Sequence, residues 1–243
     1  MIKIVWGWIA LLLCQPVFAD TPLHVPTPSE DAKEYAARFQ VTADTVLNPV
    51  YPYLAEWIRD ELQIQTLPGI GIDLGGGPGH LVFTLCQVTE AMYWINADIN
   101  PYFSARFAED ALKLGVADRV CTIFADAKWL PFRDDYADVI VSRGSFPFWG
   151  DLKLSLQEVY RVLKPGGKAL IGRGLPPTMP PAQAALVREK QSGGPKNYTV
   201  DETRKEFQQI LDALGIHHAR ILTPQPEGSN GINYGIWLLI EKK

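Results

Sequence analysis

Acidic residues and glycines follow one another at the ends of predicted strands, in a pattern suited to holding a nucleoside. Asp73 is followed by Gly75, Gly77 and Gly79, and glycines at this spacing let the chain turn sharply so that a ligand can touch the backbone. Asp98 ends the next predicted strand, 25 residues after Asp73. A carboxylate at that place can accept hydrogen bonds from both hydroxyls of a ribose. These residue types therefore predict a nucleoside or dinucleotide ligand.

The spacing of the glycines distinguishes between two classes of such ligands. The fingerprint of nicotinamide dinucleotide sites is GxGxxG, whose sixth position would be His80 counted from Gly75, or Val82 counted from Gly77. Neither residue is a glycine, so the fingerprint fails in both frames. An NAD-dependent oxidoreductase, for which the sequence also offers no proton-relay motif, is therefore the disfavoured alternative.

Four stretches together resemble the class I S-adenosylmethionine-dependent methyltransferases, in particular the enzymes of quinone biosynthesis. They are IDLGGGPG at 72–79, FADA at 124–127, LPFRDDYADVI at 130–140 and RVLKPGG at 161–167. The first is similar to the acid followed by GxGxG in that family. The middle two are similar to its D-A-x-x-L-P-F pattern, and the last to the turn before its fifth strand. The resemblance implies S-adenosylmethionine as the cofactor and methyl transfer as the reaction.

The resemblance also implies which residues hold the cofactor. In the family the acid after the third strand reaches the adenine amino group, and Asp126 has that position here with Ala127 beside it. An aromatic residue often lies near the methionine end, and Tyr51 is the candidate, with a packed core tyrosine as the open alternative. The predicted cofactor-binding residues are Asp73, Gly75, Gly77, Gly79, Asp98, Ile99, Asp126, Ala127, Ser142 and Tyr51.

The segment after the fourth predicted strand is a candidate acceptor site. It lies at the carboxyl edge of the sheet, where ligands of open α/β sheets bind. Its predicted substrate-binding residues are Arg143, Phe146, Phe148 and Trp149. The three aromatic rings either line an acceptor pocket or cover the core, and the sequence leaves both readings open. No residue is identifiable as a general base, so no catalytic residue is predicted.

Short apolar runs that alternate with helical stretches predict an α/β fold. The predicted strands are residues 69–74, 92–97, 119–125, 137–142, 168–173, 217–223 and 233–241. The loop between the last two is too short for a crossover, so these strands must pair antiparallel. We therefore expect a Rossmann-like, seven-stranded, mostly parallel sheet with an antiparallel last strand and helices on both faces.

The N-terminal residues predict a segment that is separate from the folded domain. Residues 1–19 have one lysine, an apolar run and a small-residue end, which is typical of a signal peptide or an uncleaved anchor. A proline-rich linker over 20–29 leads to a domain over 30–243, with an insertion or lid in 174–200. Ser29 is the expected cap of the first of two N-terminal helices in 30–65, the second of which starts at about Tyr53, and Thr199 is a possible cap of a helix over 201–214. A signal peptide favours a periplasmic or membrane-associated location, whereas the cofactor favours the cytoplasm.

Charge and cysteine content exclude some partners. The formal net charge is -4 and no basic stripe is present, so we expect no nucleic-acid partner, and membrane contact only through residues 1–19. The three cysteines have no metal-ligand spacing, so no metal is predicted. The sequence thus predicts a methyltransferase that acts on a small-molecule acceptor. The alternative is an exported, non-catalytic binding protein on the same scaffold.

Overall fold

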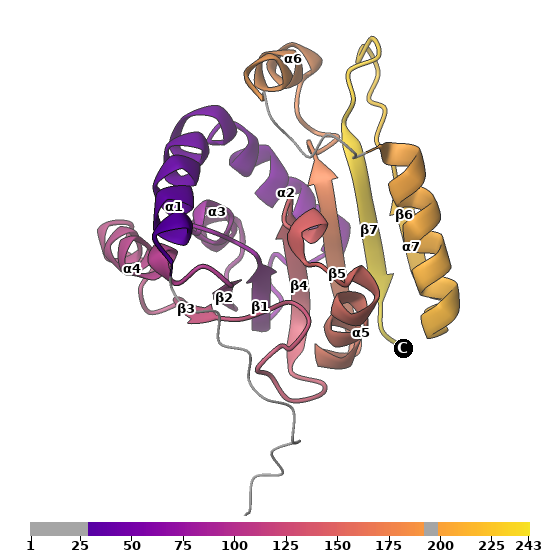
Figure 1. Cartoon of the computed structure of the whole chain (residues 1–243), viewed down its shortest axis with the longest axis horizontal. Coiled ribbons are helices and arrows are strands. Elements are labelled where there is room, and N and C mark those ends of the chain that lie inside the picture. The colour runs from indigo at the N-terminus through magenta and orange to yellow at the C-terminus, as the bar shows by residue number, and fades with distance from the viewer. Residues whose placement is uncertain (1–28, 192–198) are drawn as a thin grey trace, which may run out of the picture.

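A computed structural model describes residues 29–191 and 199–243, shown as a coloured ribbon in Figure 1. The predicted signal peptide or anchor at 1–19, the linker up to residue 28 and residues 192–198 of the predicted lid lie outside the described residues. Within them, seven strands form one sheet in the order β3-β2-β1-β4-β5-β7-β6.

The sheet has the predicted topology. The strands are β1 Gly69–Leu74, β2 Met92–Asp98, β3 Val120–Phe124, β4 Ala137–Arg143, β5 Leu163–Gly174, β6 Ala219–Leu222 and β7 Gly235–Glu241. Neighbours from β3 to β5 pair parallel, whereas β7 pairs antiparallel with both β5 and β6. The mostly parallel sheet with an antiparallel last strand is confirmed.

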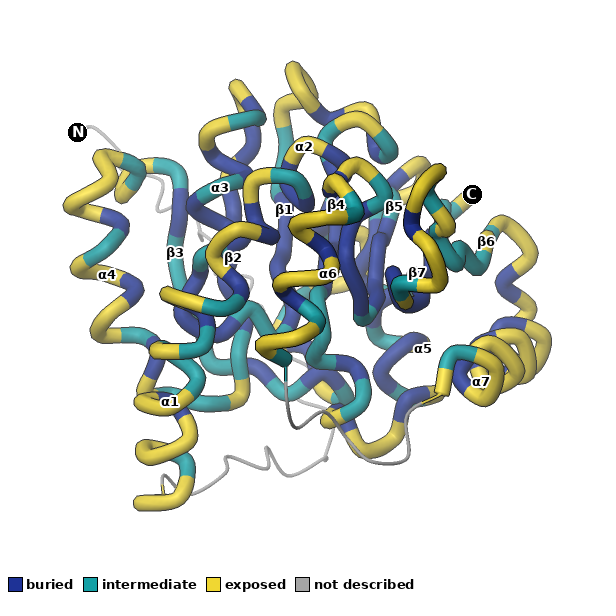
Figure 2. The backbone as a smooth tube through the Cα atoms, turned by 90° about the horizontal axis from the view of Figure 1, so that it is seen from above, coloured by how far each residue is buried: buried dark blue, intermediate teal, exposed yellow. Residues whose placement is uncertain are grey.

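Helices cover both faces of the sheet, as Figure 1 shows. The helices are α1 Glu30–Thr42, α2 Val50–Leu62, α3 His80–Val88, α4 Ser104–Lys113, α5 Leu152–Val162, α6 Pro181–Lys190 and α7 Val200–Leu214, with short helices at Ala43–Leu47, Pro101–Phe103 and Phe146–Phe148. α2, α3, α4 and α6 contribute to the core on one face, and α5 and α7 to the core on the other. In Figure 2 the central strands are buried, while α1, α4 and α7 expose their outer sides.

The alternation of side chains along the strands divides the interior into two cores. In β7, Trp237 and Leu239 pack toward the α2 side, whereas Ile236, Leu238 and Ile240 pack toward α5 and α7. This is the two-residue period of a strand that is buried on both faces. It also explains why β7 reads as a continuous apolar run.

Capping residues mark several helix starts as the sequence predicted. Ser29 Oγ accepts the Ala32 N–H at 3.1 Å at the start of α1, and Thr199 Oγ1 accepts the Glu202 N–H at 3.2 Å at the start of α7. The second N-terminal helix begins at Val50, before the predicted start at Tyr53. Pro52 lies in its first turn, where the missing N–H costs nothing.

The fifth strand begins earlier than predicted. It starts at Leu163 and includes the stretch KPGG, with a register irregularity against β4 between Ala137 and Val139. In the described residues, no helix is long and apolar enough to cross a membrane.

Candidate functional site

A cavity of about 560 Å³ opens at the carboxyl edge of the sheet. Its wall combines the segments that follow β1, β2, β3 and β4 with one side of α1. Strand order explains this, because β3, β2, β1 and β4 are neighbours and parallel, so their carboxyl ends meet. The predicted site residues come from these four segments.

The glycine turn after β1 forms the floor between the two halves of the cavity. Gly75 has a φ of +71°, a conformation that favours glycine, and its N–H donates to the Ala97 carbonyl at 2.7 Å. A Cβ on Gly75 would lie 2.4 Å from Cβ and Oγ of Ser145. Gly75 therefore has to be a glycine both for its backbone and because the loop after β4 packs against it.

Asp98 presents a carboxylate to the cavity from the end of β2. One oxygen accepts the Gly77 N–H at 2.8 Å and the other accepts the Asn100 N–H at 2.8 Å. Burial raises the pKa of Asp98, and these backbone hydrogen bonds oppose that shift. These backbone donors orient the carboxylate, which faces the cavity and can accept further hydrogen bonds from ribose hydroxyls.

Asp126 lines the cavity after β3, together with Ala127. Its Oδ1 accepts the Lys128 N–H at 2.9 Å, and its Oδ2 lies 3.6 Å from Lys128 Nζ. The side chain thus stabilises its own loop and offers a hydrogen-bond acceptor to the cavity. Because β2 lies between β3 and β1, Asp126 and the glycine turn are on opposite sides of Asp98. The strand order places it where the resemblance assigns the adenine.

Asp73 lies beneath the glycine turn rather than in the cavity wall. It is 1% exposed, and burial, with a smaller contribution from Asp98, raises its pKa to about 8. Its Oδ2 and the Oδ1 of neighbouring Asn96 both lack a hydrogen-bond partner. A Cβ on Gly76 would lie 2.6 Å and 2.1 Å from these two atoms. A neutral Asp73 carboxyl could donate its proton to Asn96, so Asp73 supports the turn from below.

The loop after β4 forms the other end of the cavity. Arg143, Phe148 and Trp149, the residues predicted to bind the acceptor, line this end of the cavity. Phe148 is 67% exposed, whereas Trp149 is 7% exposed and donates from Nε1 to Ser145 Oγ at 3.0 Å. The loop therefore offers one fixed ring, one exposed ring and one guanidinium.

Besides Asp73, four predicted site residues do not line the cavity. Phe146 is buried against Phe207, with ring centroids 5.2 Å apart, so it covers the core. Ser142 is buried and bonds to Ser145 Oγ at 2.6 Å. Tyr51 is 7% exposed and stacks on His80, with centroids 5.4 Å apart. Gly79 forms the start of α3, where Phe107 packs against its Cα.

Residues that the sequence reasoning missed also line the cavity. The missed polar residues are Ser29, Asn100, Lys128 and Ser145, and the aromatic ones are Tyr35 and Phe39. Tyr35 and Phe39 lie one helical turn apart on α1 and stack with centroids 5.9 Å apart. Asn100 Nδ2 donates to the Ala32 carbonyl at 2.8 Å, and this bond fixes α1 over the end of β2. The sequence shows that Tyr35 and Phe39 are four residues apart, but it does not indicate which side of α1 faces the cavity.

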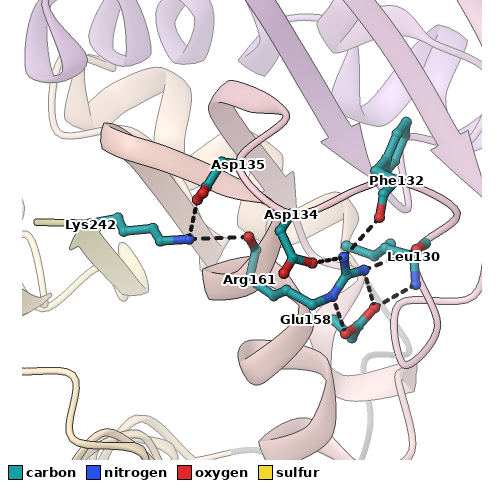
Figure 3. A network of polar contacts seen from close by, with 7 residues as sticks. All are labelled: Leu130, Phe132, Asp134, Asp135, Glu158, Arg161 and Lys242. Carbon is teal, nitrogen blue, oxygen red and sulfur yellow. Dashed lines mark hydrogen bonds and ion pairs between the residues drawn. The ribbon is translucent and has the colours of Figure 1, made fainter.

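Arg161 in α5 fixes the loop that follows Asp126, as Figure 3 shows. Its guanidinium donates to the carbonyls of Phe132 and Leu130 at 2.8 and 3.2 Å. It also pairs with Glu158 at 2.7 Å and Asp134 at 2.8 Å. The arginine of the RVLKPGG stretch therefore has a structural role, because it connects α5 to the loop that follows Asp126.

The predicted lid does not cover the site in the part of 174–200 that the structure describes. Met179 and Val187 pack into the core on the α2 side, and none of residues 174–191 lines the cavity. Across the described ranges, no cluster of His, Cys, Asp and Glu could hold a metal ion.

The residues present fit S-adenosylmethionine. Asp98 would hold the ribose hydroxyls, Asp126 and Ala127 the adenine, and the turn at Gly75 and Gly77 leaves the backbone open to the ligand. The two lining carboxylates disfavour a pyrophosphate, because they would repel its charge at short range.

The order of the strands, the glycine turn after β1 and the Asp98 carboxylate at the end of β2 together define a Rossmann-like nucleoside-binding domain. The family model described as a methyltransferase domain matches residues 72–171. A solved structure from Methanococcus maripaludis, described as a candidate S-adenosyl-L-methionine-dependent methyltransferase, superposes with a TM-score of 0.76 at 28% identity and covers 89% of this chain and 96% of that one. This chain therefore contains a class I S-adenosylmethionine-dependent methyltransferase domain, with S-adenosylmethionine as the cofactor of its class.

Curated relatives match part of the chain. The chloroplastic 2-methyl-6-phytyl-1,4-hydroquinone methyltransferase of Spinacia oleracea is 33% identical over 142 residues, 54% of this chain and 38% of that protein. The ubiquinone/menaquinone biosynthesis C-methyltransferase UbiE of Pectobacterium carotovorum is 36% identical over 101 residues, 41% of this chain and 40% of that protein. The human arginine-hydroxylase NDUFAF5 is 32% identical over 100 residues, 40% of this chain and 26% of that protein. The chain thus spans about two fifths or less of the length of these relatives.

Proposed function

We propose that this protein transfers the methyl group of S-adenosylmethionine to a small-molecule acceptor. The observation that carries the proposal is the oriented Asp98 carboxylate, which faces a single cavity together with the glycine turn. The relatives named for hydroquinone and quinone biosynthesis support a small cyclic acceptor. The aromatic side chains at the other end of the cavity suit such a ring.

When bound, the cofactor would supply an electrophilic methyl group on its sulfonium sulfur, and the leaving group would be the neutral thioether S-adenosylhomocysteine. The protein therefore mainly has to align the acceptor and keep water out. Trp149, fixed through Ser145, provides a flat wall for the acceptor, and Phe148 lies at the exposed mouth. Asp98 and Asp126 hold the nucleoside end at the other side of the glycine turn. No general base is assigned, because the need for one depends on the pKa of the acceptor.

Calorimetric titration with S-adenosylhomocysteine tests the cofactor site. We expect wild-type protein to bind it, and Asp98→Ala to weaken binding by about 1–3 kcal/mol, because the ribose hydroxyls lose a charged acceptor. Asp118→Ala, an exposed acid outside the cavity, is the matched control and should bind like wild type. Absence of any heat or thermal shift with wild-type protein would refute the proposal.

Product analysis distinguishes methyl transfer from binding alone or from another reaction on the same scaffold. Incubation with methyl-labelled S-adenosylmethionine and a panel of hydroquinones, phenols and aromatic acids should give a labelled product. Cofactor binding without any labelled product, together with recovery of the native protein outside the cytoplasm on cell fractionation, would favour the exported, non-catalytic binding protein. The sequence of residues 1–19 motivates that second candidate.

A further inference from the structure

Arg143 is a partly buried cation in the cavity wall, and among the described residues no acidic group forms an ion pair with it or acts on its pKa. It is the last residue of β4 and lines the cavity. Its Nε is buried without a hydrogen-bond partner. The groups that act on its charge are the Tyr51 hydroxyl and the Arg173 guanidinium, and burial lowers its pKa. Neither Asp98 nor Asp126, the two acids in the cavity wall, is among them.

A guanidinium in this state is costly for the folded protein. Removing a charge from water is unfavourable unless the charge is paired and hydrogen-bonded. The neighbouring wall offers Gly144, Ser145, Phe148 and Trp149, none of which carries a negative charge. Arg173 adds a second positive charge nearby on β5. The Arg143 guanidinium therefore gives the β4 end of the cavity a positive charge, which a bound anion would neutralise.

We infer that Arg143 binds a carboxylate group of a ligand in this cavity, in a two-pronged contact of guanidinium and carboxylate. The inference rests on the proposed function and adds the chemical group that the β4 end of the site recognises. A planar guanidinium matches a carboxylate with two parallel hydrogen bonds. A monoanion is favoured over a dianion, because the carboxylates of Asp98 and Asp126 line the same cavity.

Two ligands could supply this carboxylate. One is the amino-acid end of the cofactor, and the other is an acceptor that carries an aromatic acid. Strand order places Arg143 across β1 from Asp98, and this is compatible with either source. The apolar surroundings of Phe148 and Trp149 would pack against the ring of an aromatic acid.

The first arm of the test removes the carboxylate from the cofactor side. S-adenosylhomocysteine and 5′-methylthioadenosine share the adenosyl sulfur, but only the first has the amino-acid carboxylate. Their dissociation constants are measured by calorimetry with wild type, Arg143→Gln, Arg143→Lys and the exposed control Arg133→Gln. If the cofactor is the source, Arg143→Gln weakens S-adenosylhomocysteine roughly tenfold or more, and leaves 5′-methylthioadenosine unchanged.

The second arm removes the carboxylate from the acceptor side. With S-adenosylhomocysteine saturating, benzoate and its neutral isostere benzamide are titrated by ligand-observed NMR. If the acceptor is the source, wild-type protein binds benzoate in preference to benzamide, and Arg143→Gln loses that preference while Arg133→Gln retains it. Arg143→Lys should restore part of the affinity, because it keeps the charge and loses the two-pronged geometry.

Either pattern supports the inference and identifies the source of the carboxylate. The inference is overturned if Arg143→Gln, folded by near-ultraviolet circular dichroism, changes neither the cofactor pair nor the benzoate preference. In that case S-adenosylhomocysteine still binds and the proposed function stands. If wild-type protein binds neither adenosyl compound, it is the proposed function that fails.

Discussion

At the residue scale, Asp73 lies under the glycine turn, and burial raises its pKa to about 8. The unfolded chain loses this proton near the ordinary value of 3.8, whereas the folded protein keeps it. Between these two values the native state holds the extra proton, so stability is greatest at low pH and falls as the pH rises. The slope can approach about 1.4 kcal/mol per pH unit for one group.

Asp73→Asn should remove that pH dependence. The amide is neutral at every pH and can donate to Asn96 as a protonated carboxyl would. We expect the variant to gain stability over wild type as the pH rises from about 5 to about 8, by roughly 1 kcal/mol or more. Urea unfolding at both pH values measures the difference, with the exposed Asp118→Asn as control. A wild-type-to-variant difference that stays constant with pH would contradict a neutral Asp73.

Gly75 combines a left-handed backbone with a close neighbour, and substitution separates the two effects. Gly75→Ala adds both the φ cost and a contact of 2.4 Å with Ser145. Gly166→Ala adds only the φ cost, because its φ is +79° and no atom lies within 4 Å of the new Cβ. We expect Gly166→Ala to cost about 1–2 kcal/mol and Gly75→Ala to cost measurably more by urea unfolding.

The double variant Gly75→Ala with Ser145→Gly is the rescue. It removes the contact but not the backbone cost. Because Ser145→Gly alone loses the hydrogen bonds of Ser145 Oγ to Leu74 and Trp149, the double variant should be destabilised by less than the sum of the two single variants. Equal losses for the two alanine variants would show that the Ser145 contact does not constrain Gly75.

Sequence reasoning placed the polar half of the site better than the aromatic half. Asp98, Asp126 and the glycine turn follow strand ends directly, and parallel strands bring such ends together. Tyr51 and Phe146 are aromatic residues near the right strands, but both pack into the interior. Whether a ring faces a cavity or the core depends on the rotation of its helix, which short segments with apolar residues on several sides do not specify.

At the scale of elements, Arg161 fixes the loop between β3 and β4 to α5. It is part-buried and donates to two carbonyls as well as to two acids. Lysine cannot reproduce this fork, because it is a point charge without planar, fixed donors. The loop begins just after Asp126, so loosening it should also affect the nucleoside end of the site.

Arg161→Lys should therefore destabilise the protein by about 1–3 kcal/mol. It should also weaken S-adenosylhomocysteine binding, although Arg161 does not line the cavity. Urea unfolding and calorimetry measure the two effects, and Arg133→Lys, an exposed arginine in the same loop, is the control. Unchanged stability in Arg161→Lys would mean that the network in Figure 3 contributes little.

The elements themselves were predictable where one strong pattern decided them. Apolar runs located all seven strands, and caps such as Ser29 and Thr199 located helix starts. The boundaries that moved are those with proline or glycine, at Pro52 and at the start of β5. There, pairing with a neighbouring element decided the outcome, and local sequence does not contain that information.

At the scale of the whole molecule, residues 29–243 contain both cores and the whole described cavity wall. A chain of residues 29–243 should therefore unfold cooperatively. Its dissociation constant for S-adenosylhomocysteine should lie within about twofold of that of the full chain, which corresponds to a difference in binding free energy below about 0.4 kcal/mol. Thermal unfolding and calorimetry test this. A chain that begins at residue 43 lacks Tyr35 and Phe39 and should bind more weakly. Equal binding by both truncated chains would contradict a role for α1 in the site.

Ser145 Oγ joins the floor of the cofactor half to the wall of the acceptor half. It donates to the Leu74 carbonyl at 2.9 Å and accepts from Trp149 at 3.0 Å. We therefore expect that a ligand which restrains the glycine turn also restrains Trp149, and the reverse. By thermodynamic reciprocity, any factor by which one ligand raises the affinity of the other must apply equally in the opposite direction, and calorimetric titration of each ligand with and without the other measures that factor. Ser145→Ala would leave both compartments in place but make their occupancies independent of each other.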